Sequence, residues 1–219
     1  MIKSLLHFNN PNDLTRDEVE GVSWTVNGTV SSSQDGRFGN CLSLNGDGYL
    51  QNNTIDLSLD KEWTLDMWIY ASNFYGDQPF VSIKCPSNRN IKQGMYAFNH
   101  FFFIATKSNS WVSYDLGAPN GEWFHFALVN SSSLLYAFVN GIKKFEHDNT
   151  NINLLNSPEV LIGYVYSRNK FIGLIDEFRI SNKALWTSDF TPPATESEYH
   201  QAPKYIYIDK NNTVMGMKE

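Results

Sequence analysis

The middle of the chain carries two short runs of aromatic and β-branched residues. The first run covers residues 123–129 and the second 134–139, and the residues between them, 130–133, are polar. Runs of this composition joined by so short a loop predict an antiparallel β-hairpin. Asn140 and Gly141 follow, and this pair favours a type I′ turn because both residues tolerate positive φ. The more polar run 142–145 then predicts a third strand, nearer an edge of the sheet.

The first of these runs is largely apolar on both of its faces. Trp123, His125, Ala127 and Val129 share one face, and the residues between them, which are Phe, Phe and Leu, share the other. A strand that is apolar on both sides is typical of a central position in a covered sheet. His125 is therefore predicted to be a core histidine that hydrogen-bonds a neighbouring strand.

The same alternation of short apolar runs and turn residues continues along the chain. Strands are expected at 4–8, 23–30, 41–44, 49–50, 63–70, 79–85, 95–98, 101–104, 111–114, 159–163 and 171–180, and one helical turn at 183–188. So many short strands with Gly, Asn and Pro between them predict a β-sandwich or jelly roll. The residues expected to contribute to the core include Trp63, Leu65, Met67, Ala127, Val129 and Phe178.

The C-terminal part differs in composition. Residues 194–203 are polar and predict a linker, and 205–208 and 213–215 predict a small hairpin. A lone two-stranded hairpin is marginal in water, so this one is expected to dock on the sandwich, on a neighbouring subunit or on a partner. We therefore expect a jelly-roll domain at 1–193 and an anchoring or oligomerising extension at 194–219.

Composition and charge narrow the classes of protein. The chain has 219 residues, of which 42% are hydrophobic and 15% aromatic, which indicates a folded aromatic-rich β protein. A net charge of −6 disfavours a nucleic-acid partner, and no apolar run is long enough for membrane insertion. The start of the chain predicts no signal peptide. Cys41 and Cys85 cannot make a disulfide framework, and Cys41 is expected to be a buried free thiol.

Several motifs occur in a characteristic order and spacing. They are the stretches 5–8, 37–39, 42–46, 63–68, 123–129, 135–141, 162–163 and 173–180, with 187–193 closing the series. Together they resemble the concanavalin A-like lectin/glucanase superfamily, in particular its laminin-G-like jelly-roll modules of the phage and bacterial type. The resemblance covers roughly residues 2–193. It implies an all-β, two-sheet antiparallel jelly-roll sandwich, but one fold hosts many activities.

The carboxylates do not match the catalytic pattern of the superfamily. Its glycan-cleaving enzymes carry Glu-x-Asp-x-Glu or Glu-x-Asp-x-x-Glu on one strand, which aims an acid and a nucleophile into one cleft. The stretches 146–148 and 196–198 stop short of this spacing, and strand alternation predicts that Asp176 and Glu177 point to opposite faces. Zinc-ligand spacing, a nucleophile elbow and a phosphate-binding loop are also absent from the sequence. We therefore expect a chain that is not an enzyme.

A structural Ca²⁺ is a further implication of the resemblance, because related sandwiches hold one near a closing strand. Its oxygen ligands would include Asp176, with Asn45 and Asp47 in the turn that precedes Tyr49. Asn45 stands where many relatives carry Asp, which removes a negative charge. The alternative is that Asp176 accepts hydrogen bonds from backbone amides. No cofactor is required by either interpretation.

Glycan binding without catalysis needs an exposed aromatic ring for the sugar face and polar groups for the hydroxyls. The residues that offer this mixture are Trp68, Tyr70, Tyr75, Asp77, Tyr164, Tyr166, Arg168 and Asn169. Trp68 and Tyr70 share one face of a strand and are candidates to line a concave sheet. The alternative for each of these residues is ordinary packing.

These patterns favour a non-catalytic lectin-like adhesion module. We expect it on a bacteriophage virion or tail fibre, where it contacts cell-surface glycans. The alternative is a structural virion decoration or assembly protein without glycan specificity. Its partners would be a cell-surface glycan or other virion proteins, with a homo-oligomer formed through 194–219. The particle exterior is the expected location, because phage proteins assemble without a signal peptide.

Overall fold

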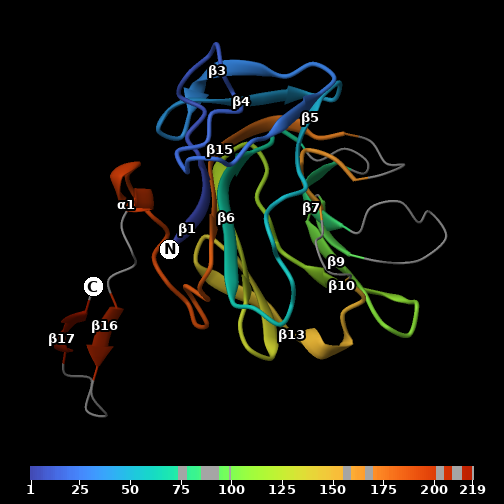
Figure 1. Cartoon of the computed structure of the whole chain (residues 1–219), viewed down its shortest axis with the longest axis vertical. Helices are drawn as coiled ribbons and strands as arrows, with labels where there is room; N and C mark the ends of the chain where they lie inside the picture. Colours follow the sequence, from blue (N-terminus) through green and yellow to red (C-terminus); the bar gives the residue numbers. More distant parts are fainter. Residues whose placement is uncertain are drawn as a thin grey trace.

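Two antiparallel sheets packed face to face form the body of the protein (Figure 1). The structure is a computed structural model that describes residues 1–73, 78–84, 94–98, 100–154, 159–165 and 170–200, together with the backbone of 205–208 and 214–218. The all-β sandwich expected from the sequence is confirmed. Cys41 is buried and free, and burial raises the pKa of its thiol to about 12. Cys85 lies outside the described residues.

The first sheet has eight strands in the order β13-β12-β11-β6-β15-β4-β3, with β1 beside β15. Its strands are β1 (Ile2–Leu6), β3 (Ser31–Gly36), β4 (Gly39–Asn45), β6 (Trp63–Tyr70), β11 (Trp123–Asn130), β12 (Leu134–Val139), β13 (Ile142–Asp148) and β15 (Ile172–Ser181). As predicted, β11 is central, between β6 and β12, and β13 lies at an edge.

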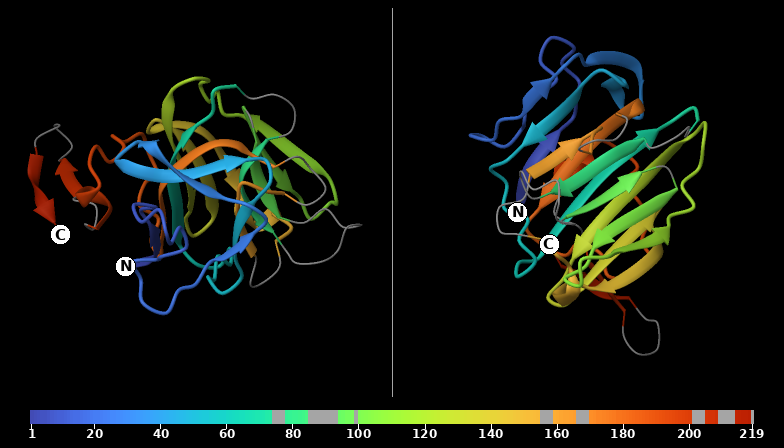
Figure 2. Two further views of the ribbon diagram at one scale, coloured as in Figure 1. Left: turned by 90° about the horizontal axis from the view of Figure 1, so that it is seen from above. Right: turned by 90° about the vertical axis from the view of Figure 1, so that its right-hand side faces the viewer.

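The second sheet has seven strands in the order β10-β9-β8-β7-β14-β5-β2. Its strands are β2 (Thr25–Asn27), β5 (Tyr49–Asn52), β7 (Pro79–Lys84), β8 (Met95–Phe98), β9 (Phe101–Ala105), β10 (Trp111–Asp115) and β14 (Glu159–Ile162). This sheet faces the viewer in the right panel of Figure 2.

The turn between β12 and β13 has the predicted type I′ backbone, since Asn140 and Gly141 have φ values of 51° and 76°. Gly141 is needed there for a second reason. A Cβ on it would lie 1.8 Å from the carbonyl oxygen of Phe190, whose N–H donates to the Gly141 carbonyl. The turn therefore also seats a segment that arrives from far along the chain.

The core between the sheets is rich in phenylalanine. Phe80 meets Phe124, Phe126 and Phe171 at ring-centroid distances of 5.2–6.4 Å in edge-to-face contacts. Each of these rings is fully buried. Of the predicted core residues, Trp63, Leu65, Met67 and Phe178 belong to this cluster, and Ala127 and Val129 to a second cluster on the outer face of the eight-stranded sheet.

Residues 182–200 cover that outer face, and we call them the strap. Thr64 binds the strap twice, by donating from Oγ1 to the Lys183 carbonyl and by accepting from the Leu185 N–H. Trp186 and Phe190 stack with ring centroids 3.8 Å apart. The helical turn predicted at 183–188 is wrong, because hydrogen bonds to the sheet hold this stretch irregular; the helices among the described residues are η1 (Asn149–Asn151) and α1 (Ser197–His200).

The C-terminal hairpin consists of β16 (Tyr205–Ile208) and β17 (Val214–Lys218), which pair with each other. The ribbon of this hairpin lies outside both large sheets in Figures 1 and 2. The predicted boundary at residue 193 falls inside the strap, since Tyr199 is fully buried on the sheet. Among the described residues, no helix has the length and apolarity to cross a membrane.

Candidate functional site

Five aromatic side chains lie together on the outer face of the seven-stranded sheet, and we call them the aromatic platform. They are Tyr96 and Phe98 on β8, Phe101 and Phe103 on β9, and Trp111 on β10. Side chains alternate between the two faces of a strand. The intervening residues Ala97, Phe102 and Ile104 fill the core, so the platform residues point outward. Figure 2 (right) shows this side of the sheet, with the three strands at the front.

Cross-strand stacking holds the platform in place. Tyr96 pairs with Phe103, and their rings are 5.2 Å apart and inclined by 10°. Phe98 stacks on Phe103 at 4.9 Å, and Trp111 meets Tyr96 edge-on at 5.3 Å. Such cross-strand aromatic pairs stabilise a sheet and fix the orientation of each ring. The rings of the platform are therefore held in fixed orientations.

The platform is also partly open to solvent. Phe101 is 42% exposed, and Phe98, Phe103 and Trp111 are half-buried. Ser113 and Asp115 lie on the same face of β10, opposite Phe103 and Phe101, and both are exposed. A contiguous exposed aromatic surface with polar groups at its side is typical of an interaction site. The ring faces can stack on the C–H face of a sugar while the polar groups meet its hydroxyls.

The two aromatic residues predicted on β6 lie on the opposite side of the sandwich. Trp68 is only 6% exposed, and the Arg37 guanidinium carbon lies 4.4 Å from the centre of its ring. The ring face of Trp68 is thus covered, as in the packing alternative. Tyr70 is half-buried and tilted against Trp123 at 5.9 Å.

Among the predicted loop residues, Tyr164 is half-buried and stacks on Tyr49 with ring centroids 4.4 Å apart. The Lys170 ammonium lies 6.0 Å from the centre of the Tyr49 ring, which adds a cation to this pair. The other predicted loop residues lie outside the described part of the chain; they are Tyr75, Asp77, Tyr166, Arg168 and Asn169.

Beneath the strap lies a buried charged network. The Arg179 Nε and Nη2 atoms donate to the two carboxylate oxygens of Asp66 at 3.0 Å each, and His125 Nε2 lies 3.1 Å from Oδ2. Burial alone would raise the pKa of Asp66, but the Arg179 charge and the His125 hydrogen bond lower it. Burial also lowers the pKa of His125, so this ring is neutral and donates from Nε2. Asp66 and His125 are fully buried, which makes the network structural and confirms the core histidine.

The three residues predicted for calcium do not meet in one place. Asp176 is fully buried and accepts from the N–H groups of Phe38 and Glu177. Asn45 pairs with Ile172, which precedes Asp176 by roughly 13 Å along β15. Asn45 and Asp47 instead hydrogen-bond each other within their turn. Calcium binding at Asp176 stays a prediction.

The comparisons with known proteins agree with this architecture. Residues 44–189, well over half of the chain, match the family model of the concanavalin A-like lectin/glucanases superfamily. The chain belongs to this superfamily. No relative was found among curated protein sequences.

Several solved structures have a similar fold. Domain 4 of AbnA, a GH43 extracellular arabinanase from Geobacillus stearothermophilus, in complex with arabinotriose, superposes with a TM-score of 0.64 at 21% identity, over 84% of this chain and 93% of that domain. The binding domain of botulinum neurotoxin serotype D has a TM-score of 0.60 at 16% identity, over 84% of this chain and 49% of that one. The binding domain of Paraclostridial Mosquitocidal Protein 1 has a TM-score of 0.58 at 15% identity, over 83% of this chain and 48% of that one. The chain thus spans about half of each toxin domain, and at these identities the likeness shows the fold alone.

The aromatic platform was not among the sites predicted from the sequence. Its strands were expected, but its rings were assigned to no site. A usable signal is present in the alternation, because the aromatic residues at 96, 98, 101, 103 and 111 all fall on one face of adjacent strands. That signal requires knowing which face is covered by the other sheet.

Proposed function

We propose that this member of the superfamily is a non-catalytic, lectin-like module that binds glycans through the aromatic platform. The observation that supports this most directly is the set of ring-stacked aromatic side chains on β8, β9 and β10, of which all but the buried Tyr96 are at least partly exposed. Rings held in this way lose little further freedom on binding, which favours affinity.

Two further observations support the proposal. Domain 4 of the arabinanase shares the fold, and its structure contains arabinotriose. The Asp66–Arg179–His125 network is buried under the strap and is therefore unavailable to a substrate. A binding role without hydrolysis fits both.

A glycan array with a matched pair of variants tests this proposal. Trp111→Ala removes a platform ring, whereas Trp123→Ala removes a half-buried tryptophan on the other sheet. We expect saturable, sugar-competed binding that Trp111→Ala weakens roughly 10- to 100-fold, in line with losing about 1.5–3 kcal/mol of apolar contact. Trp123→Ala should leave binding unchanged. If Trp123→Ala weakens binding and Trp111→Ala does not, the site lies on the eight-stranded sheet and the proposal is wrong.

The second candidate function is a structural protein without glycan specificity, such as a virion decoration. The exposed aromatic platform also suits contact with another protein, and one neighbouring neurotoxin binding domain is a complex with rat synaptotagmin II. A flat array profile from a correctly folded protein would favour this alternative.

We place either function on the exterior of a phage particle. The support is the resemblance of the closing segment 187–193 to phage and bacterial laminin-G-like modules. Immunolabelling of intact purified particles tests the location, since an exterior protein is accessible to antibody and an internal one is not.

A further inference from the structure

A bulge in β15 creates an unusual junction in the interior of the eight-stranded sheet, where β15 lies between β6 and the strands β4 and β1. The first part of β15 pairs with β4 and the last part with β1, and its pairing with β6 is interrupted between Asp176 and Arg179. Glu177 sits in this interruption with φ = 52°, a left-handed backbone, and is fully buried. The bulge therefore directs the Glu177 carboxylate into the space where β1 ends.

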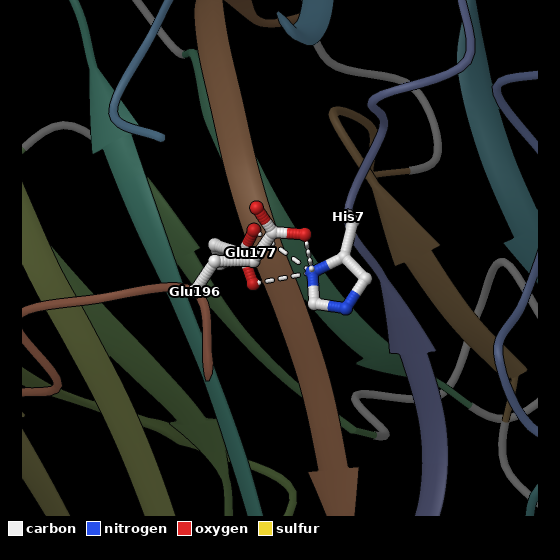
Figure 3. A group of neighbouring side chains, drawn as sticks. All are labelled: His7, Glu177 and Glu196. Atoms are coloured by element: carbon white, nitrogen blue, oxygen red, sulfur yellow. Dashed lines mark hydrogen bonds and ion pairs between the residues drawn. The ribbon is translucent and has the colours of Figure 1, made fainter. Parts of the chain in front are cut away.

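Two other segments bring side chains to the same point (Figure 3). His7 follows β1, and its Nδ1 atom lies 2.7 Å and 2.9 Å from the two carboxylate oxygens of Glu177. Glu196, from the strap, places Oε1 3.7 Å from the same nitrogen. One ligand atom from each of the three side chains lies within 4.8 Å of the others.

We propose that His7, Glu177 and Glu196 bind a divalent transition-metal ion of the zinc type. Zinc–nitrogen and zinc–oxygen bonds of about 2.0–2.2 Å put the ligand atoms of a tetrahedral site about 3.3 Å apart. The observed separations from Nδ1, 2.7 Å and 3.7 Å, bracket that value. Small shifts of these side chains are therefore enough to bring the three ligand atoms to the spacing of a tetrahedral site, with Nδ1 of His7 deprotonated.

The charges at this point favour a cation with two positive charges. Glu177 and its neighbour Asp176 are both fully buried, and Glu196 adds a third carboxylate nearby. A protonated His7 would balance only one of the two carboxylates that face it, whereas a divalent ion with neutral His7 balances both. Buried charges in proteins are generally paired or coordinate metals. The imidazole ligand selects an ion of the zinc type over Ca²⁺ and Mg²⁺, which prefer oxygen ligands.

Supporting contacts and an access route are also present. The Asn9 amide nitrogen donates to Glu196 Oε1 at 3.1 Å, and the Asn9 side-chain oxygen is fixed by the N–H of Asn40. Hydrogen bonds of this kind, made to a ligand side chain rather than to the metal, orient metal ligands. A polar pocket of about 400 Å³ adjoins His7 and Glu196 and includes Asp13 and Glu18 in its lining. An ion and a coordinating water can reach the site through it.

Bound metal would join the end of β1, the bulge of β15 and the strap. Since only the folded chain brings these segments together, metal binding adds to stability by mass action. The site would therefore act as a removable cross-link that holds the strap on the sheet, separately from any role of the aromatic platform.

Titration of the full-length, tag-free protein after EDTA treatment tests the proposal. We expect one Zn²⁺ per chain and a rise in melting temperature with Zn²⁺, but not with Mg²⁺. Glu196→Gln should weaken Zn²⁺ binding by at least the 10- to 100-fold typical of losing a supporting partner, and its side chain is 43% exposed, so the fold should persist. His147→Gln, which removes a histidine far along the sheet on β13, is the matched control and should bind as the parent does.

Substitution with Co²⁺ gives a readout that needs no variant. Cobalt in a site with one imidazole and two carboxylate ligands shows visible d–d absorption that saturates at one ion per chain, and Zn²⁺ should displace it. Failure of the parent protein to bind Zn²⁺ saturably would overturn the proposal and leave a His7–Glu177 ion pair. Binding unchanged in both Glu196→Gln and His7→Gln would overturn it as well.

Discussion

Asp66 is the residue that joins the buried charged network beneath the strap. Its carboxylate satisfies both Arg179 and His125 in a place that water does not reach. We predict that Asp66→Ala lowers the free energy of unfolding by about 3–5 kcal/mol, because it leaves the Arg179 charge buried and unpaired. Urea denaturation measures this loss. Asp60→Ala, at an exposed aspartate, serves as the control and should change stability very little.

A double variant shows whether the loss of stability in Asp66→Ala comes from the unpaired charge of Arg179. Replacing Asp66 and Arg179 together by apolar residues should cost much less than the sum of the two single changes, since a buried ion pair is often neutral against an apolar pair. Additive costs would mean that the two side chains do not act as a pair.

His125 gives the stability a dependence on pH. Burial lowers its pKa in the folded state below the ordinary value of about 6.5. As pH falls through that value, the unfolded chain takes up the proton first, so stability is complete above about pH 6.5 and decreases toward the folded-state pKa. We predict a smaller decrease for His125→Gln, from urea denaturation at a series of pH values.

The difference between the two pH curves isolates His125. Burial raises the pKa of Asp176 to about 6 and that of Glu177 to about 7, so these groups contribute with the opposite sign, in both proteins alike. Curves of the same slope would show that His125 titrates normally.

The strands that carry Asp66, Asp176 and Glu177 could be predicted from the sequence, but the partners of these side chains could not. Strand alternation places Asp66 on the same face of its strand as Trp68, but its partner Arg179 lies 113 residues away and the strap carries no regular pattern. Alternation also predicted that Asp176 and Glu177 point to opposite faces of a regular strand. The bulge, which has no signal in the amino-acid pattern, instead buries both carboxylates.

At the scale of elements, the turn at Gly141 joins the hairpin to the strap. We predict that Gly141→Ala destabilises the protein more than Gly121→Ala by about 1 kcal/mol or more. Both glycines have positive φ, so both variants carry similar backbone strain of about 1–2 kcal/mol. Only at Gly141 does the added methyl group meet a backbone atom, the Phe190 carbonyl oxygen. The loss of stability in the two variants is compared by thermal unfolding. Equal losses would mean that the strap shifts away from the added methyl group at little cost.

Elements with strong apolar alternation could be predicted well, and those held by neighbours could not. The strands at 63–70 and 95–98 match their predicted limits. By contrast β3, with the sequence Ser-Ser-Ser-Gln-Asp-Gly, lacks apolar residues and is held at the sheet edge by pairing with β4. The strap was partly predicted as helix, since its contacts with Thr64 and Gly141 are set by the folded sheet.

At the scale of the whole molecule, two truncations separate the strap from the hairpin. A chain that ends at residue 203 keeps Tyr199, which is fully buried with the Arg179 guanidinium carbon 4.6 Å from the centre of its ring. We predict that this chain keeps its full stability. A chain that ends at residue 194 loses Tyr199 and Glu196, and its unfolding free energy should fall by about 3 kcal/mol or more, as for removal of a buried aromatic side chain.

Light scattering on the same two chains tests the oligomerisation expected of residues 194–219. If the hairpin mediates assembly, the chain that ends at 203 is monomeric although it is fully stable. An unchanged oligomer in that chain would assign assembly to another surface.

The pairing of β1 with β15 has a consequence for how the protein is made. Ile2 is opposite Ser181, so β1 leaves the ribosome long before its partner strand and pairs with it only when almost the whole domain has been translated. At about 5–20 residues per second, this wait lasts roughly 10–40 s. During that time Leu5 and Leu6, which end up fully buried, have no sheet to cover them. The nascent chain is thus an expected client of chaperones that hold exposed apolar segments until synthesis is complete.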